Sequence, residues 1–183
     1  HLIDIGGFSA HHSSPMRYFA YGSNLCMPRL KWRGADPTMP RLAYLEGHSL
    51  TFNKRSDDGS AKANIAVARD ASSIVWGVMF TISDHKMTGL RQAEGHPHHY
   101  SEQVVPVVMN DEAHDVTTYV ACDNFILQDE NVRPFRWYLA HIIQGAETFG
   151  LPQPYIEQLK RTPTLEDRDR DRHRRERAFW GTH

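Results

Sequence analysis

The chain has 183 residues, of which 40% are hydrophobic, so it can bury one sizeable core, and its length indicates one main domain. Its 21 Lys and Arg residues nearly balance 22 Asp and Glu residues, which leaves a formal net charge of −1 and no overall field to attract nucleic acid or anionic lipid. The longest apolar run, Ile74–Ile82, is far shorter than the ~20 residues that a membrane-spanning helix needs. A small-molecule or protein partner is therefore expected, with no nucleic acid and no membrane.

The cysteine content and the two ends of the chain suggest a compartment and a domain layout. Cys26 and Cys122 are too few for a secreted disulfide framework, so we expect a cytoplasmic protein in which both are small core residues. Residues 1–15 lack the basic flank and apolar stretch of a secretion signal. Their Gly, Ser and His-His content resembles an expression-vector remnant, with Met16 as the natural start. Residues 16–163 are then the folded domain and residues 164–183 a charged tail.

Strands are predicted where β-branched and aromatic residues gather between turn residues. These segments are residues 17–21, 43–52, 63–69, 74–81, 100–109 and 116–121. The last two are joined through residues 110–114, which resemble a hairpin loop.

Helices are predicted in three places between and after the strands. A short helix begins after Ser83, a candidate N-cap, and ends before Gly95, which puts Glu94 in its last turn. Apolar residues repeat with helical spacing over residues 134–149, and a third helix covers residues 155–160. Mixed strands and helices without regular βαβ alternation favour an α+β fold with a strongly curved or closed sheet.

Residues 166–177 are almost purely charged and alternate in sign, as in a solvated helix. The aromatic pair Phe179 and Trp180 follows this run and can anchor it. The anchor docks either on the folded domain or on a second subunit. We favour the second subunit, and therefore a homodimer, because it would bury an otherwise exposed aromatic pair.

An aromatic run breaks at a Gly-Ser-Asn turn near the start of the domain. Backbone N–H groups freed at such a strand-to-helix turn can point together at an anion, which makes the turn a candidate substrate cradle. Taken alone, the same residues are typical of an ordinary tight turn. Ser23 is not in a Gly-x-Ser-x-Gly elbow, so we expect its hydroxyl to cap the turn rather than act as a nucleophile.

Five short motifs, read in order along the chain, resemble those of the gamma-glutamyl cyclotransferases. They are Tyr18-Phe19-Ala20-Tyr21-Gly22-Ser23-Asn24-Leu25, Ala63-Asn64-Ile65-Ala66, Val75-Trp76-Gly77-Val78, Glu94-Gly95 followed by Tyr100, and Gly145-Ala146 with Gly150-Leu151-Pro152. The similarity extends from about Arg17 to Leu159. Its most specific part is the tyrosine-glycine-serine opening combined with a glutamate-glycine pair about seventy residues later.

This resemblance implies a compact mixed β-barrel flanked by helices, with no metal and no organic cofactor. It also implies a reaction of glutathione metabolism, in which 5-oxoproline is released from a gamma-glutamyl compound. Glu94 matches the family's catalytic acid/base. The substrate-binding positions implied by the resemblance are Tyr18, Phe19, Ala20, Tyr21, Gly22, Ser23, Asn24, Leu25, Tyr119, Asp123 and Tyr138.

The residue types agree with that chemistry. An α-ammonium group is not a nucleophile, so a carboxylate must first remove a proton and later return one to the departing nitrogen; one glutamate can do both. The leaving group stays open between an amino acid, an amine and a carrier-bound metabolite. A non-catalytic gamma-glutamyl or carboxylate-binding module on the same fold is the alternative, although Glu94 argues against it because a binder of anions gains nothing from a carboxylate.

His96, His98 and His99 follow Glu94 closely and invite a metal interpretation. Zinc sites need about four ligands, and this loop supplies no clear set. We expect instead that the three histidines lie at the mouth of the pocket. Whether they gate it stays open.

Overall fold

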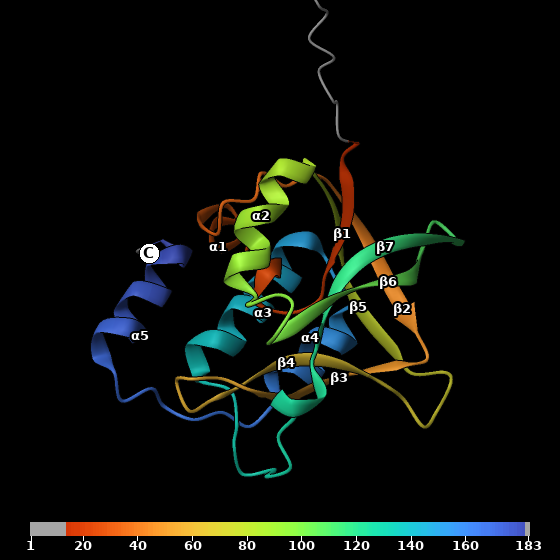
Figure 1. The fold of residues 1–183 in the computed structure, drawn as a ribbon. Coiled ribbons are helices and arrows are strands. Elements are labelled where there is room, and N and C mark those ends of the chain that lie inside the picture. Colours follow the sequence, from red (N-terminus) through yellow and green to blue (C-terminus); the bar gives the residue numbers. More distant parts are fainter. Residues whose placement is uncertain (1–13, 182–183) are drawn as a thin grey trace, which may run out of the picture.

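The computed structural model describes residues 14–181, and five of its strands close into a barrel (Figure 1). Around the barrel the order is β1 (Met16–Ala20), β5 (Ile74–Ile82), β2 (Thr38–Glu46), β6 (Tyr100–Met109) and β7 (Glu112–Ala121). Neighbours are antiparallel except at the closure, where β1 and β7 run parallel with Tyr18 opposite Thr117. The predicted α+β class and mixed barrel are confirmed. The predicted remnant at residues 1–15 lies outside the described residues except for its last two.

The predicted strand over residues 43–52 is wrong, because it is two strands. β2 ends at Glu46 and β3 (His48–Arg55) begins two residues later, on the other side of Gly47. The φ of Gly47 is +67°, a conformation that favours glycine and breaks the strand. β3 leaves the barrel and pairs with β4 (Ala61–Val67) in a separate two-stranded sheet below it (Figure 1).

The loop predicted between the last two strands is also shorter than expected. β7 begins at Glu112, so only Asn110 and Asp111 connect it to β6. Both have positive φ, 49° and 62°, as a two-residue type I′ hairpin turn requires. The longer strands extend the β6–β7 ladder along its whole length, which holds Tyr100 and Tyr119 on adjacent strands.

Five helices accompany the sheets in the described part of the chain. They are α1 (Met27–Trp32), α2 (Asp84–Ala93), α3 (Arg136–Phe149), α4 (Gln153–Lys160) and α5 (Arg170–Arg177). The predicted helices correspond to α2, α3 and α4, and the charged run forms α5. Ser83 occupies the N-cap position of α2 without a capping side-chain bond. Among residues 14–181, no helix is long and apolar enough to cross a membrane.

The turn after β1 packs tightly against α3. A one-turn 3-10 helix, η1 (Ser23–Leu25), follows β1, and a Cβ on Gly145 of α3 would lie 2.4 Å from the Leu25 backbone and side chain. Only glycine allows this approach. The contact fixes the Gly-Ser-Asn turn between the barrel and α3, and Leu25 is fully buried there.

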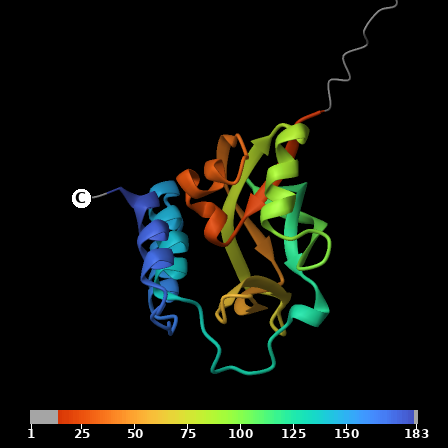
Figure 2. The ribbon, with the colours of Figure 1, turned by 60° about the vertical axis from the view of Figure 1, so that its left-hand side comes forward.

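The charged tail docks on its own chain. Figure 2 shows α5 alongside α3, with the C-terminal end beside them. The Trp180 indole Nε1 donates to His141 Nδ1 of α3 at 2.8 Å, and the Phe179 ring lies edge-on to Trp32. The aromatic anchor therefore contacts the folded domain of its own chain, the first of the two expected docking modes; a contact with a second subunit and the homodimer stay predictions.

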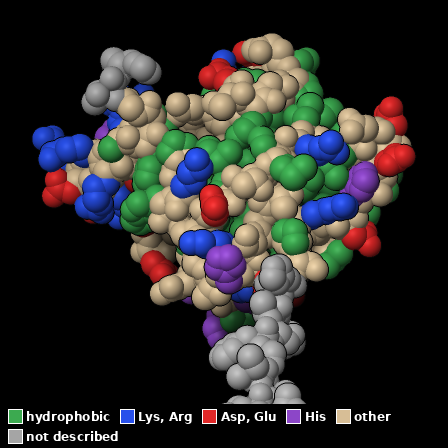
Figure 3. Space-filling model, turned by 90° about the horizontal axis from the view of Figure 1, so that it is seen from above, with side chains coloured by type: hydrophobic (Ala, Val, Ile, Leu, Met, Phe, Trp, Pro, Cys, Tyr) green, Lys and Arg blue, Asp and Glu red, His purple; other side chains and the backbone are tan. Residues whose placement is uncertain are grey.

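Two carboxylates reinforce this docking. Asp167 accepts from Trp137 Nε1 at 2.8 Å and pairs with Arg172 at 2.6 Å. Glu176 accepts from Arg29 at 3.1 Å and from His141 Nε2 at 2.8 Å. On the face in Figure 3, positive and negative side chains lie among hydrophobic ones, as the near-zero net charge predicts.

Candidate active site

Two helix ends place a carboxylate and a guanidinium together. Glu94 caps the C-terminus of α2, where the chain turns through Gly95 with a φ of +63°, and Arg33 caps the C-terminus of α1. The helices approach closely because α2 has Gly89 at their contact, where a Cβ would come within 2.6 Å of the Arg33 carbonyl oxygen. This packing holds the Arg33 side chain beside Glu94.

Both bonds to Glu94 go to one of its oxygens. Arg33 Nη1 donates to Oε1 at 2.6 Å, and Asn24 Nδ2 donates to the same atom at 2.8 Å. Asn24 Nδ2 also lies 2.7 Å from the Tyr18 hydroxyl oxygen. Among the described residues, Oε2 has no hydrogen-bond partner, so it is the oxygen that a ligand can reach. Burial opposes the charge of Arg33, but the Glu94 carboxylate outweighs it and raises the Arg33 pKa.

Glu94 faces a small inner cavity with aromatic walls. The cavity is lined by Tyr18, Tyr21, Gly22, Ser23, Asn24, Ala63, Glu94, Tyr100, Tyr119 and Tyr138. Its volume is about 30 Å³, space for roughly one or two water molecules. Burial raises the pKa of the Tyr18, Tyr21 and Tyr138 hydroxyls, so they stay neutral near pH 7.

The tyrosines are fixed by bonds to the surrounding strands. Tyr100 donates to the Ala63 carbonyl oxygen at 2.7 Å, and the Ala63 N–H donates to the Tyr138 hydroxyl at 3.0 Å. Tyr119 donates to Glu102 Oε1 at 2.8 Å, and Tyr21 donates to the Tyr119 carbonyl oxygen. Hydrogen bonds therefore connect the wall of the cavity to strands β4, β6 and β7.

The Gly-Ser-Asn turn borders this cavity and has backbone N–H groups without an acceptor among the described residues. The Leu25 N–H donates to the Gly22 carbonyl oxygen at 3.0 Å, but within residues 14–181 no acceptor is found for the N–H groups of Gly22, Ser23 and Asn24. Within residues 14–181 the Ser23 hydroxyl makes no hydrogen bond to the turn and interacts with the Tyr138 hydroxyl instead, so the predicted cap is wrong. A Cβ on Gly22 would lie 3.1 Å from Ala63 Cβ, which shows how closely the backbone approaches the opposite wall.

The structure brings together most of the predicted site residues and leaves out four. Phe19, Ala20 and Leu25 are fully buried in the core and are not among the residues that line the cavity. Asp123 is exposed at the start of a 3-10 turn after β7 and borders a different hollow. These four lie outside the lining of the inner cavity, and their expected substrate contact stays a prediction.

An outer chamber of about 400 Å³ adjoins the inner cavity. The two share Ser23, Glu94, Tyr100 and Tyr138. The chamber is further lined by Arg29, Arg33, Lys54, Ser56, Asp57, Asp58, Lys62, Gln92, Ala93, Gly95, His99, Trp137, Arg172 and Glu176. Sequence reasoning missed Arg33 and Lys54, since nothing marks an arginine or a lysine in an unrecognised segment as part of a site.

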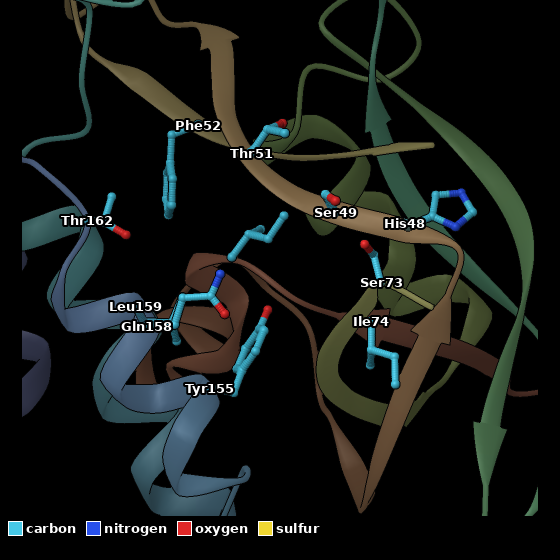
Figure 4. A pocket seen from close by; sticks show the side chains of 11 residues that line it. His48, Ser49, Thr51, Phe52, Ser73, Ile74, Tyr155, Gln158, Leu159 and Thr162 are labelled. Atoms are coloured by element: carbon cyan, nitrogen blue, oxygen red, sulfur yellow. The ribbon is translucent and has the colours of Figure 1, made fainter. Parts of the chain in front are cut away.

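A further hollow of about 340 Å³ lies between β3 and α4 (Figure 4). Its lining includes Tyr155, Gln158 and Thr162 of α4 and the following turn, facing Thr51 and Phe52 of β3. None of its lining residues is a carboxylate, lysine or arginine. It is roomier than the inner cavity, but it lacks the acid/base group that the inner cavity has.

The three histidines after Gly95 take separate positions. His99 lines the outer chamber and stacks on Phe125 with ring centroids 4.2 Å apart. His96 Nδ1 accepts from the Glu102 N–H at 3.2 Å, and His98 is exposed. Within residues 14–181, no three His, Cys, Asp or Glu side chains come close enough to hold a metal ion. Of the two cysteines, Cys26 is buried and Cys122 is partly exposed; both are unbridged.

Comparison with known proteins identifies a family model and several relatives that this chain resembles. The model of the AIG2-like family matches residues 74–159. The chain is 27% identical over 161 residues to a gamma-glutamylcyclotransferase of Mus musculus, covering 86% of this chain and 84% of that protein. The Homo sapiens protein of the same name is 27% identical over 147 residues, with coverage of 78% and 76%.

A solved structure described as gamma-glutamyl cyclotransferase superposes with a TM-score of 0.69 at 25% identity, covering 82% of this chain and 89% of that chain. The resemblance to the gamma-glutamyl cyclotransferase-like family is confirmed.

Proposed function

We propose that the protein is a gamma-glutamyl cyclotransferase that releases 5-oxoproline from a gamma-glutamyl amino acid, amine or carrier-bound gamma-glutamyl metabolite, with Glu94 as general acid/base. The observation that carries the proposal is the position of Glu94: it lines an aromatic cavity beside the Gly-Ser-Asn turn, and among residues 14–181 neither its Oε2 nor the N–H groups of Gly22, Ser23 and Asn24 have a hydrogen-bond partner. The relatives named gamma-glutamylcyclotransferase support the same reaction class.

In the proposed reaction, Oε2 of Glu94 removes a proton from the substrate's α-ammonium group. The freed amine attacks the γ-carbonyl carbon, which forms the ring C–N bond. The amide C–N bond then breaks, and Glu94 returns its proton to the departing nitrogen. The ring nitrogen also gives up a second proton, which Glu94 passes to the departing amine, so the two protons lost by the α-nitrogen equal the two gained by the departing nitrogen. No water is consumed and no other co-reactant is needed.

Two features of the site favour this ring closure. The N–H groups of Gly22, Ser23 and Asn24 can stabilise the negative charge that develops on the carbonyl oxygen. The narrow cavity keeps a bound glutamyl chain folded, which brings the amine close to the carbonyl. A cavity of about 30 Å³ is smaller than a glutamyl group, so the lining side chains must move apart when the substrate enters.

The test is the replacement Glu94→Gln, which keeps the size of the side chain and removes its proton acceptor. Release of 5-oxoproline from gamma-glutamyl compounds should fall by about 10²–10⁴-fold. Glu112→Gln is the matched control, because Glu112 is exposed at the far end of β7.

Wild-type activity in a folded Glu94→Gln protein would remove Glu94 from the mechanism. Binding of gamma-glutamyl compounds by a wild-type protein that never releases 5-oxoproline would instead establish the alternative, a non-catalytic binding module.

A further inference from the structure

Glu94 lies on the boundary between the inner cavity and the outer chamber. An acid/base that serves both the α-amine and the departing nitrogen must lie between the two halves of the substrate. If the glutamyl half occupies the inner cavity, the leaving group therefore extends into the outer chamber. This step rests on the proposed function.

Most charged groups of the outer chamber are paired with one another or with a neighbour. Arg33 pairs with Glu94 at 2.6 Å, Arg29 with Glu176 at 3.1 Å, and Lys62 with Asp58 at 2.7 Å. Arg172 pairs with Asp167 at 2.6 Å. These groups need no ligand to balance them.

Lys54 is different. The residue is 5% exposed, and within residues 14–181 no carboxylate lies within ion-pair distance of its ammonium group. Its polar neighbour is His99, with Nζ 3.4 Å from Nδ1, and Nζ also lies 5.2 Å from the centre of the Tyr100 ring. A buried charge without a counter-charge is costly, so such a group at a cavity wall is suited to an anionic ligand.

Lys54 is also correctly placed for the leaving group. Tyr100 lines both spaces, so the ammonium group that lies over its ring is separated from the inner cavity by a single side chain. Burial lowers the pKa of Lys54, while Glu94, Asp57 and Asp58 act in the opposite direction. A bound anion would add to the second effect and stabilise the charged form.

We propose that Lys54 is a specificity-determining residue that binds a carboxylate on the leaving amine. The site then selects gamma-glutamyl compounds whose leaving group is an amino acid over those whose leaving group is a neutral amine. A neutral amine leaves the ammonium group of Lys54 without a partner, whereas a carboxylate supplies a charge-assisted hydrogen bond.

The test compares two substrates that differ in this carboxylate alone, gamma-glutamyl-alanine and gamma-glutamyl-ethylamide. We expect the wild-type protein to prefer gamma-glutamyl-alanine by about tenfold to 100-fold in kcat/KM, as one charge-assisted hydrogen bond provides. In Lys54→Met, kcat/KM for gamma-glutamyl-alanine should fall to the value for the ethylamide, mainly through KM, while turnover of the ethylamide is unchanged.

Two further variants separate charge from packing. Lys54→Arg keeps the positive charge and should retain much of the preference. Lys86→Met removes an exposed lysine of α2 outside the chamber and should leave both substrates unaffected. A purely structural role of Lys54 would lower turnover of both substrates together, which would overturn the proposal.

Equal preference in the wild type and Lys54→Met would overturn the proposal and leave the cyclotransferase activity standing. If the wild type releases no 5-oxoproline from either compound, the proposed activity is wrong. Calorimetric binding of the same two compounds then decides the inference: a carboxylate preference that disappears in Lys54→Met supports it, and equal affinities overturn it.

Discussion

The shape of the candidate site depends on Gly22, because glycine has no side chain to fill the cavity. Its φ is −113°, so the need for glycine is one of space, not of backbone conformation. A Cβ would lie 3.1 Å from Ala63 Cβ and 3.7 Å from the Tyr138 hydroxyl, on the cavity side of the turn. Any side chain here would extend into the space that we propose for the glutamyl group.

We therefore predict a graded loss of 5-oxoproline binding in Gly22→Ala and Gly22→Val. The first should raise the dissociation constant a few-fold, and the second by at least about tenfold, since even one methylene group in a pocket is worth that much. Isothermal titration calorimetry measures both, with circular dichroism to confirm folding. Unchanged affinity in folded Gly22→Val would exclude the turn as the binding site.

Some residues of the candidate site can be predicted from the sequence, and others cannot. Glu94, Gly22, Tyr18 and Tyr21 belong to short motifs, so their order along the chain identifies them. Arg33 reaches Glu94 only because α1 and α2 end side by side, and Lys54 becomes buried only because β3 leaves the barrel. Such contacts depend on tertiary packing, which a single sequence does not show.

The contact between α1 and α2 determines where Arg33 and Glu94 lie. An alanine normally stabilises a helix by about 1 kcal/mol relative to glycine. At Gly89, however, a Cβ would lie 2.6 Å from the Arg33 carbonyl oxygen, and a backbone atom cannot rotate away. Steric overlap outweighs helix propensity at this position.

We predict that Gly89→Ala lowers the free energy of unfolding by about 1–3 kcal/mol, the usual cost of overpacking. It should also lower kcat by about 10²-fold, because a small displacement of positioning groups has that effect. Urea unfolding and 5-oxoproline release measure the two effects. Thr88→Ala, at an exposed position of the same helix, is the control. A Gly89→Ala protein as stable as the wild type would show that the two helices are not in close contact.

At the level of elements, a strong apolar periodicity predicts a helix correctly, whereas a local break within a strand is not predicted. α3 has a clear apolar repeat. The predicted range, residues 134–149, differs from the observed helix, Arg136–Phe149, only by two residues at its start. The single residue Gly47 splits one apparent strand into two, and α1 is only six residues long, too short for a periodic pattern. The composition of the tail predicted a helix but not the surface on which its aromatic residues dock.

At the scale of the whole molecule, docking of the C-terminal segment on the folded domain depends on His141, which must be neutral. His141 is fully buried; its Nδ1 accepts from Trp180 Nε1, so its proton is on Nε2, which donates to Glu176. Burial lowers the His141 pKa, Glu176 opposes this, and Arg29 and Arg33 add to the lowering. A second proton on Nδ1 would break the bond to Trp180.

We predict that stability falls as the pH drops below about 6.5, the ordinary pKa of histidine. The unfolded chain takes up a proton there, whereas folded His141 does so only at lower pH, so acid favours the unfolded state. Urea unfolding between pH 7.5 and 5 measures the decrease. Trp180→Phe should flatten it, because the indole donor is gone and Nδ1 can accept a proton. His85→Gln, at an exposed position, should not change it. A wild-type curve that is flat over this range would contradict the neutral state of His141.

The docked tail also has an evolutionary consequence. Every residue of the inner cavity lies between Tyr18 and Tyr138, whereas Arg172 and Glu176 of α5 form part of the outer wall. Mutations confined to the last fifteen residues can therefore reshape the space around the leaving group while the ring-forming chemistry is inherited intact. One part of the outer wall is thus encoded apart from the inner cavity, so that part can diverge while selection keeps the cavity constant.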